Sequence, residues 1–311
     1  MAKMNTNIIS DGTLPLEGCT PIPTLFIIGN GFDIAHEIES KYSDFRKFEI
    51  KRGNQRFVDL MDIFFSNQTD FWSDIETALG QYDEDSIIDF CNPEEEFDID
   101  HPTRSESAYA DSPDFIFHPL LEDLKAEFRN WVNDIDISRA ERIIRLSEDA
   151  QYLTFNYTDT LETIYNIPMQ NVFHIHGARN NVHDEYIVGH SNLRDKDTAF
   201  DDDDVYFKQE TRAKVIGWMN DVYKDVDAII YRQDKYFNSL KGIQQVIVLG
   251  HSLNDVDLPY FKRIIKKTGN DVVWKFSYYG KRDIDNINRF IAVTGLTNTK
   301  VVPFDDFVIE D

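Results

Sequence analysis

Residues 25–33 read LFIIGNGFD, and this stretch decides the fold. Its four apolar residues run without polar alternation, which is typical of a strand buried on both faces of a parallel sheet. The strand ends at the turn Gly29-Asn30-Gly31, and apolar residues at helical spacing follow it. Strand, glycine turn and helix in this order predict the first unit of an α/β fold.

The rest of the chain repeats this pattern. Further short apolar runs predict strands over residues 151–155, 171–175, 245–249, 272–277 and 300–303. Helical spacing occupies the intervals, over residues 32–51, 54–65, 74–79, 118–133, 138–148, 256–267 and 282–294. We therefore predict a doubly wound, mostly parallel sheet of Rossmann-like type, with helical and acidic insertions.

The expected domain organisation is simple. Residues 1–23 are rich in Gly and Pro and predict an irregular N-terminal arm. Residues 24–311 predict a single α/β domain, with an acidic insertion around 81–117 and helices to about 150. Residues 83–114 hold twelve acidic side chains against one basic one, Arg104. Because like charges repel, this segment favours an open, solvated loop. The run of four aspartates at 201–204 is a weak candidate for a divalent cation.

Composition restricts the partners. The chain has 311 residues, a hydrophobic share of 41% and a formal net charge of −24, which is typical of an acidic globular protein. That charge repels nucleic acid and anionic membranes, so neither is expected as a partner. No apolar run reaches the length of a membrane span, and the two cysteines, Cys19 and Cys91, have no zinc or disulfide spacing. A reducing, cytoplasmic home is the simplest interpretation.

The first candidate site is the glycine turn itself. Gly29 and Gly31, on either side of Asn30, allow backbone N–H groups to approach a phosphate at the start of a helix. Asp33 would cap that helix or hold a ribose hydroxyl. The third glycine of the dinucleotide fingerprint is replaced by Ile34, so a turn that simply requires small residues is the alternative.

Two further candidates follow predicted strands, where ligands of α/β sheets bind. Asn156 would orient a water molecule or a ribose hydroxyl, or else form an Asx turn. His176 would act as a general base, because an imidazole titrates near neutral pH, or else as a hydrogen-bonded core residue. His174 and His176 form a pair that could bind zinc with help from His190 or His251, but no cysteine is near and no metal is expected.

The last candidates lie in the turn after residue 249. Gly250, His251, Ser252 and Asp255 repeat the arrangement of strand, glycine and polar turn. The side chains of Ser252, Asn254 and Asp255 are placed to bind hydroxyl or phosphate groups, or only to cap the next helix.

Taken together, the motifs carry more information than any one of them. LFIIGNGFDIAHEI, KYSDF, FWSDIETAL, TFNYTDTLE, FHIHG and VIVLGHSLNDVDLPYF occur in this order. The set resembles the AbiH family of bacteriophage abortive-infection proteins over roughly residues 24–265. This resemblance implies a role in defence against phage and an activity that awaits a phage-derived trigger.

The same motifs are similar to the sirtuin-type NAD-binding fold. That likeness implies that Gly29, Asn30 and Gly31 line the pyrophosphate, and that Gly250 and Ser252 contact the far ribose and phosphate. It also implies that Asn156 lies at the nicotinamide ribose and that His176 is catalytic. Two departures are clear: Thr158 stands where an aspartate is usual, and the cysteines that bind zinc in sirtuin deacylases are missing, which argues against protein deacylation.

Three functions remain open on the sequence. The favoured one is hydrolysis of NAD+ at the nicotinamide glycosidic bond, with NAD+ as substrate. The others are a nucleotide sensor that acts through a partner without turnover, and a metal-dependent nuclease or phosphohydrolase. The sequence also leaves open whether the chain forms a homo-oligomer.

Overall fold

The computed structural model describes residues 22–66, 68–92, 100, 102–181, 185–196, 206–269 and 271–309. The chain folds as two compact units where the sequence predicts one domain with an insertion. The first, called here the sheet unit, comprises Met1–Ile38, Asp136–Val182 and Asp227–Asp311. The second, the helical unit, comprises Glu39–Ile135 and His183–Val226. Most of the predicted N-terminal arm lies outside the described residues.

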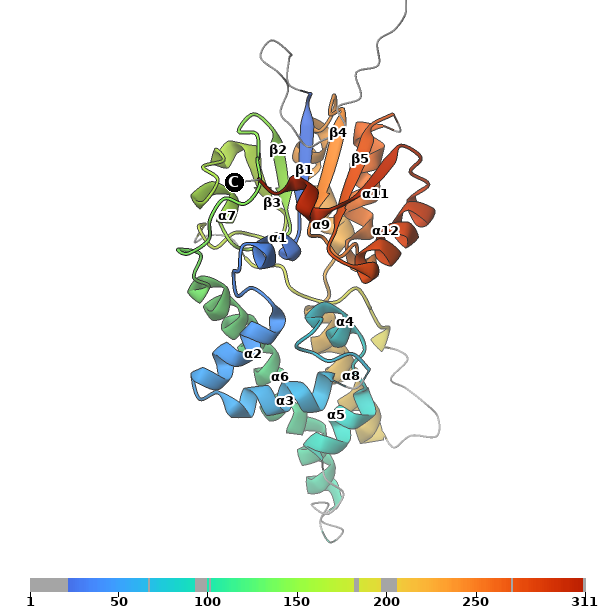
Figure 1. Cartoon of the computed structure of the whole chain (residues 1–311). Coiled ribbons are helices and arrows are strands. Elements are labelled where there is room, and N and C mark those ends of the chain that lie inside the picture. The colour runs from blue at the N-terminus through green and yellow to red at the C-terminus, as the bar shows by residue number, and fades with distance from the viewer. Residues whose placement is uncertain are drawn as a thin grey trace, which may run out of the picture. The chain divides into compact units, whose positions relative to one another are not determined.

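The sheet unit is built on six strands, which the structure places at β1 (Thr24–Ile28), β2 (Gln151–Thr154), β3 (Val172–His174), β4 (Gln245–Leu249), β5 (Val273–Tyr278) and β6 (Thr299–Pro303). Their order is β3-β2-β1-β4-β5-β6, and every neighbouring pair is parallel (Figure 1). The predicted doubly wound parallel sheet is therefore confirmed, with each strand within two residues of its predicted bounds.

Burial explains why β1 lies at the centre. Leu25, Ile27 and Ile28 are fully buried, so side chains on both faces of the strand are covered. Phe26 stacks on Tyr152 of β2 with the ring centroids 5.1 Å apart. Removing each large apolar side chain from water contributes about 2 kcal/mol. An uninterrupted apolar run is what a central parallel strand requires.

Helices and 3-10 turns complete the sheet unit: α1 (Asn30–Ala35), α7 (Thr160–Thr163), η2 (Met169–Asn171), α9 (Val226–Arg232), α10 (Asp234–Ser239), η4 (Asp255–Asp257), α11 (Leu258–Thr268), α12 (Lys281–Thr294) and η5 (Phe304–Phe307). In Figure 1, α11 and α12 lie alongside the β4–β5 half of the sheet and α7 beside β3. Both α11 and α12 are strongly amphipathic, with apolar side chains gathered on one face, as expected of helices that bury one face against a sheet.

Two helices predicted from the sequence differ from the structure, one in part and one entirely. The helix predicted over 32–51 breaks after α1, because Glu37 takes a positive φ of 60° that a helix cannot accommodate. Residues 138–148 form no helix. Ile144 instead makes an antiparallel bridge to Val308, and the N–H groups of Ile143 and Ile144 both donate to the hydroxyl of Tyr165, at 3.2 and 3.3 Å.

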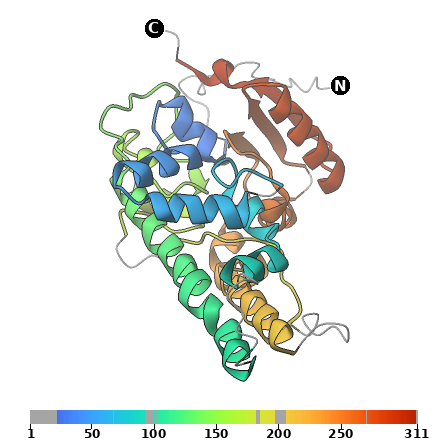
Figure 2. The same ribbon diagram turned by 90° about the horizontal axis from the view of Figure 1, so that it is seen from below.

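The helical unit contains α2 (Tyr42–Lys51), α3 (Gln55–Phe65), α4 (Ile75–Gly80), α5 (Glu84–Cys91), α6 (Pro102–Asp134) and α8 (Tyr206–Asp221). The long α6 lies side by side with α8, as both views show (Figures 1 and 2). Aromatic rings form much of the unit's core; Phe45, for example, stacks on Trp131 with centroids 5.2 Å apart. Among the described residues, no helix combines the length and apolarity needed to span a membrane.

The acidic segment is largely helical where it is described, and the expectation of an open loop is wrong there. Ile87 and Ile88 of α5 are buried and anchor the segment through apolar contacts. Its carboxylates meet basic side chains of α8: Lys214 Nζ donates to Asp111 at 2.9 Å and to Asp114 at 3.1 Å. Opposite charges on a neighbouring helix offset the repulsion that the sequence alone suggests. The aspartates at 201–204 lie outside the described residues.

Candidate functional site

The strand order places the candidate residues at one edge of the sheet. The chain runs outward from β1 through β2 to β3, then returns to pair β4 with the other side of β1. This reversal is a topological switch point, where ligands of open α/β sheets bind beyond the carboxyl ends of the strands. The turns after Ile28, Thr154 and Leu249 all lie at that edge.

The two glycine turns pack directly against each other. Gly29 N donates to Leu249 O at 3.0 Å, and Gly31 N donates to Gly250 O at 2.8 Å. Gly250 has a φ of +63°, and a Cβ there would lie 2.3 Å from the nitrogen of Phe32. The glycines thus allow two backbones to meet, which is the second of the two interpretations drawn from the sequence. The N–H groups of Gly29 and Gly31 are engaged within the protein, while Asn30 is exposed at the start of α1.

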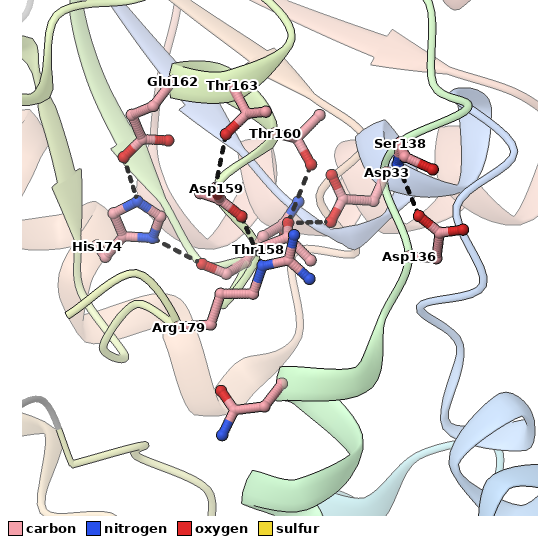
Figure 3. A network of polar contacts seen from close by, with 12 residues as sticks. Asp33, Asp136, Ser138, Thr158, Asp159, Thr160, Glu162, Thr163, His174 and Arg179 are labelled. Carbon is pink, nitrogen blue, oxygen red and sulfur yellow. Dashed lines mark hydrogen bonds and ion pairs between the residues drawn. The ribbon is translucent and has the colours of Figure 1, made fainter. Parts of the chain in front are cut away.

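Asp33 is a buried carboxylate, with a side chain about 1% exposed. It lies inside α1, whose N-cap is Gly29, so its predicted role as the helix cap is wrong. Its Oδ2 accepts a hydrogen bond from Thr158 Oγ1 at 2.5 Å, and Thr160 donates in turn to Thr158 at 3.2 Å (Figure 3). Its Oδ1 has no hydrogen-bond partner among the described residues.

Burial raises the pKa of Asp33 to about 6, because a charged carboxylate loses the hydration it has in water. The hydrogen bond from Thr158, the nearby polar side chains of Thr160 and Asn156, and the positive charge of Arg179 lower the pKa and limit this rise. A carboxyl group with a pKa near neutrality can both accept and release a proton under cellular conditions.

Asn156 joins the ends of two strands. It follows β2, and its Nδ2 donates to the carbonyl oxygen of Gly29 at 3.2 Å. Its side chain therefore reaches across to the turn after β1 instead of closing an Asx turn. The residue is buried, and its Oδ1 has no hydrogen-bond partner in the described part of the chain. A buried acceptor without a donor is costly and is a common sign of a ligand or water site.

His174 does not form a zinc pair with His176. Its Nδ1 donates to the carbonyl oxygen of Asn156 at 3.0 Å, and its Nε2 lies 2.9 Å from Glu162 Oε1 (Figure 3). Both ring nitrogens of His190, which belongs to the helical unit, also have protein partners, Met219 O and Asn192 N. The described residues contain no group of three or more His, Cys, Asp or Glu side chains arranged to hold a metal ion.

His176 and His251 share one carboxylate, that of Asp257. His176 Nε2 lies 3.9 Å from Asp257 Oδ1, and His251 Nε2 lies 3.6 Å from Asp257 Oδ2. Leu253 N donates to His251 Nδ1 at 2.9 Å, so this nitrogen is an acceptor and the proton of a neutral His251 is on Nε2, toward the carboxylate. Phe155 packs against both imidazoles, with centroids at 5.2 and 4.3 Å.

Asp257 is the site residue that the sequence analysis misses. It ends η4 and precedes the first residue of α11, a position where an acidic residue is usually a helix cap. Its side chain makes no capping hydrogen bond. The available signal was its place seven residues after Gly250 in the same polar turn, within reach of two strand-end histidines.

Ser252 and Asp255 are displaced from this cluster. Both are exposed, and the loop that carries them is held by α12: Asn286 Nδ2 donates to Ser252 O at 3.1 Å, and Arg289 Nη1 donates to Asp255 Oδ2 at 3.2 Å. Leu253 between them has a φ of +57°, an unusual value for a side chain of this size. Asp255 therefore forms a surface ion pair in this structure, and Ser252 is an exposed residue held through its backbone carbonyl.

The sheet edge and its polar residues lie within one stretch that matches a family model. The model is that of Bacteriophage abortive infection AbiH, and it matches residues 25–278. This chain belongs to the AbiH family. The AbiH match covers every candidate residue from Gly29 to Asp257, and the family ties the chain to abortive infection by bacteriophage. No curated protein and no solved structure matches the chain.

Proposed function

We propose that this AbiH protein acts in abortive infection by hydrolysing NAD+ at its nicotinamide glycosidic bond. The observation that carries the proposal is the buried acceptor Asn156 Oδ1, which has no donor among the described residues and lies at the switch point of a Rossmann-like sheet. A nucleotide is the ligand class that such edges commonly bind.

Hydrolysis of the nicotinamide glycosidic bond requires few catalytic groups. The bond between ribose and nicotinamide breaks through an oxocarbenium-like state, and nicotinamide leaves as a neutral molecule, so no strong general acid is required. A positioned water molecule and a proton acceptor are needed. Asn156 Oδ1 would hold the water or a ribose hydroxyl, and His176 would accept a proton from either one. Asp257 would orient the His176 ring and stabilise its protonated form.

The phosphates need donors other than the glycine turns. Because the N–H groups of Gly29 and Gly31 already donate to Leu249 and Gly250, they do not supply a pyrophosphate cradle in this conformation. Exposed polar groups at the same edge, Asn30 and Ser252, are the donors that we assign to this task.

The test is nicotinamide release by the purified full-length chain, with and without EDTA. We expect release that survives EDTA in the wild type and falls about 100-fold or more in Asn156→Ala and His176→Ala. The exposed Asp285→Asn in α12 serves as the control and should retain the wild-type rate. Folded protein that binds NAD+ saturably without product would replace hydrolysis by nucleotide sensing. Activity that is abolished by EDTA would instead favour the metal-dependent alternative.

The role in defence has its own readout. Bacteria that express the wild-type chain should show a drop in cellular NAD+ after infection and fewer plaques, and both effects should be lost with His176→Ala. Protection that persists in this variant while the folded protein accumulates normally would separate defence from the proposed chemistry.

A further inference from the structure

Two buried side-chain oxygens at the switch point lack a hydrogen-bond donor among the described residues. Asp33 Oδ1 and Asn156 Oδ1 are both acceptors, both enclosed, and neither has a hydrogen-bond donor among the described residues. They belong to adjacent segments, since Asn156 Nδ2 is bonded to Gly29 O at the start of α1, and the Asn156 amide lies close enough to the Asp33 carboxylate to lower its pKa. Water and hydroxyl groups are the small donors that can satisfy such acceptors.

We propose that Asp33 is the catalytic base that takes the proton from the attacking water molecule, with Asn156 holding that water. The inference rests on the proposed function and refines it: His176, with Asp257, then acts at the ribose hydroxyls. Thr158 stands where the sirtuin-type motif usually has an aspartate. In the structure an acid does reach that point, because Thr158 is hydrogen-bonded to Asp33 from α1.

The step balances in atoms and charge. An O–H bond of water breaks, and its proton moves to Asp33 Oδ1. The water oxygen forms the new bond to the anomeric carbon as the bond from that carbon to the nicotinamide nitrogen breaks, and the electron pair of that bond stays on nicotinamide. The products are nicotinamide and ADP-ribose, and Asp33 then returns its proton to solvent.

The surroundings of Asp33 suit a base and are not those of a structural ion pair. Its Oδ2 is held by Thr158 at 2.5 Å, which fixes the carboxylate and leaves Oδ1 for the ligand. Arg179, whose positive charge lowers the pKa of Asp33, is engaged by Asp159 at 2.5 Å and acts on Asp33 only through space (Figure 3). Thr160 and Asn156 are the remaining polar groups that face the carboxylate. A base held mostly by neutral donors keeps its pKa near the pH at which it works.

The test is the pH profile of nicotinamide release from pH 5 to 8.5 by the full-length wild-type chain and three variants. Asp33→Asn should lower kcat about 100-fold or more while KM changes by less than about threefold. Thr158→Val removes the donor that lowers the pKa of Asp33, so the acidic limb of the profile should move to higher pH by about one unit. Thr163→Val is the matched control, because it removes a hydroxyl of α7 that bonds Asp159 instead, and it should leave the limb in place.

The outcomes are separable. A wild-type rate in Asp33→Asn, or an acidic limb that Thr158→Val does not move, overturns the role of Asp33 and leaves NAD+ hydrolysis standing. A purified wild-type chain that releases no nicotinamide overturns both proposals. Loss of activity in Asp33→Asn through misfolding is recognised by circular dichroism, and the Thr158→Val profile then decides the question.

Discussion

Gly31 donates its backbone N–H to the carbonyl oxygen of Gly250, 2.8 Å away, and so joins the turn after β1 to the turn after β4. The two residues follow neighbouring central strands, and a Cβ added to either one would lie within 3 Å of backbone atoms of the other. This contact sets the distance between the two strand ends that carry the candidate site. The effect of replacing glycine at this contact can be measured as a change in the free energy of unfolding.

Gly250→Ala should destabilise the chain by about 3 kcal/mol or more, because a Cβ would lie 2.3 Å from a backbone nitrogen in a segment that cannot move away. Gly242→Ala is the matched control: it also has a positive φ, +91°, but no atom lies within 4 Å of the new Cβ. It should cost only about 1 kcal/mol. Urea denaturation of both variants measures the difference, and equal losses would contradict the role assigned to crowding.

The buried Asp33 should make stability depend on pH in an unusual direction. Its pKa is raised from 3.8 in water to about 6 in the folded chain, so between these values the folded state holds a proton that the unfolded state has lost. Stability should therefore fall as the pH rises from 4 to 6, by up to about 3 kcal/mol, and then level off.

Asp33→Asn should remove this contribution, because an amide does not ionise. Unfolding free energies at pH 4, 5, 6 and 7.5 test this. Between pH 4 and 6 the stability of the variant relative to the wild type should rise, because only the wild type loses the contribution of Asp33. The exposed Asp285→Asn should follow the wild type at every pH. A difference that does not change with pH would show that the folded carboxyl group titrates normally.

Removing the hydroxyl of Tyr165 should cause a large loss of folding stability. Its hydroxyl accepts from two backbone N–H groups and lies 2.6 Å from His36 Nε2, so its own proton is directed to the imidazole. Tyr165→Phe leaves several buried polar groups unpaired and should cost about 2 to 4 kcal/mol. Tyr231→Phe, at a side chain that is 83% exposed, should change stability by less than about 0.5 kcal/mol. Thermal and chemical unfolding would show the contrast.

The helical unit has its own buried ion pair. Lys224 Nζ lies 2.9 Å from Glu76 Oε1, and the lysine side chain is fully buried. Glu76→Ala leaves this ammonium group without its carboxylate and should cost about 3 to 5 kcal/mol. Glu122→Ala, in an exposed pair with Lys125, should cost less than about 1 kcal/mol. Comparable losses in the two variants would show that the Lys224–Glu76 pair contributes no more than a surface pair.

The sheet could be predicted from sequence because its strands are short, continuous apolar runs that end at turns, a pattern that few other structures produce. The helix break at Glu37 could not, because apolar spacing continues through residues 32–48 while the backbone turns. The segment 138–148 has helical spacing, yet its backbone groups bond to Tyr165 and to residues near the C-terminus. Such partners are distant in sequence and leave no local pattern.

The candidate site likewise has residues whose position could be predicted from the sequence and residues whose position could not. Asn156 and His176 each lie two residues beyond the end of a strand, so their place at the sheet edge was predictable. The contact of Asp257 with two histidines depends on how the turn after β4 is shaped by Leu253 and α12, which no spacing rule describes. The engaged N–H groups of Gly29 and Gly31 likewise depend on a second glycine turn, far along the chain.

The strand order also has a consequence for synthesis on the ribosome. β1 ends at Ile28, and its central neighbour β4 ends at Leu249, about 220 residues later. At about 5 to 20 residues per second, one side of β1 remains without its partner strand for about 10 to 45 s after β1 is made. During this interval an apolar strand with open hydrogen-bonding groups must be shielded from other nascent chains. The time at which residue 249 leaves the ribosome therefore sets the earliest moment at which the sheet edge described here can form.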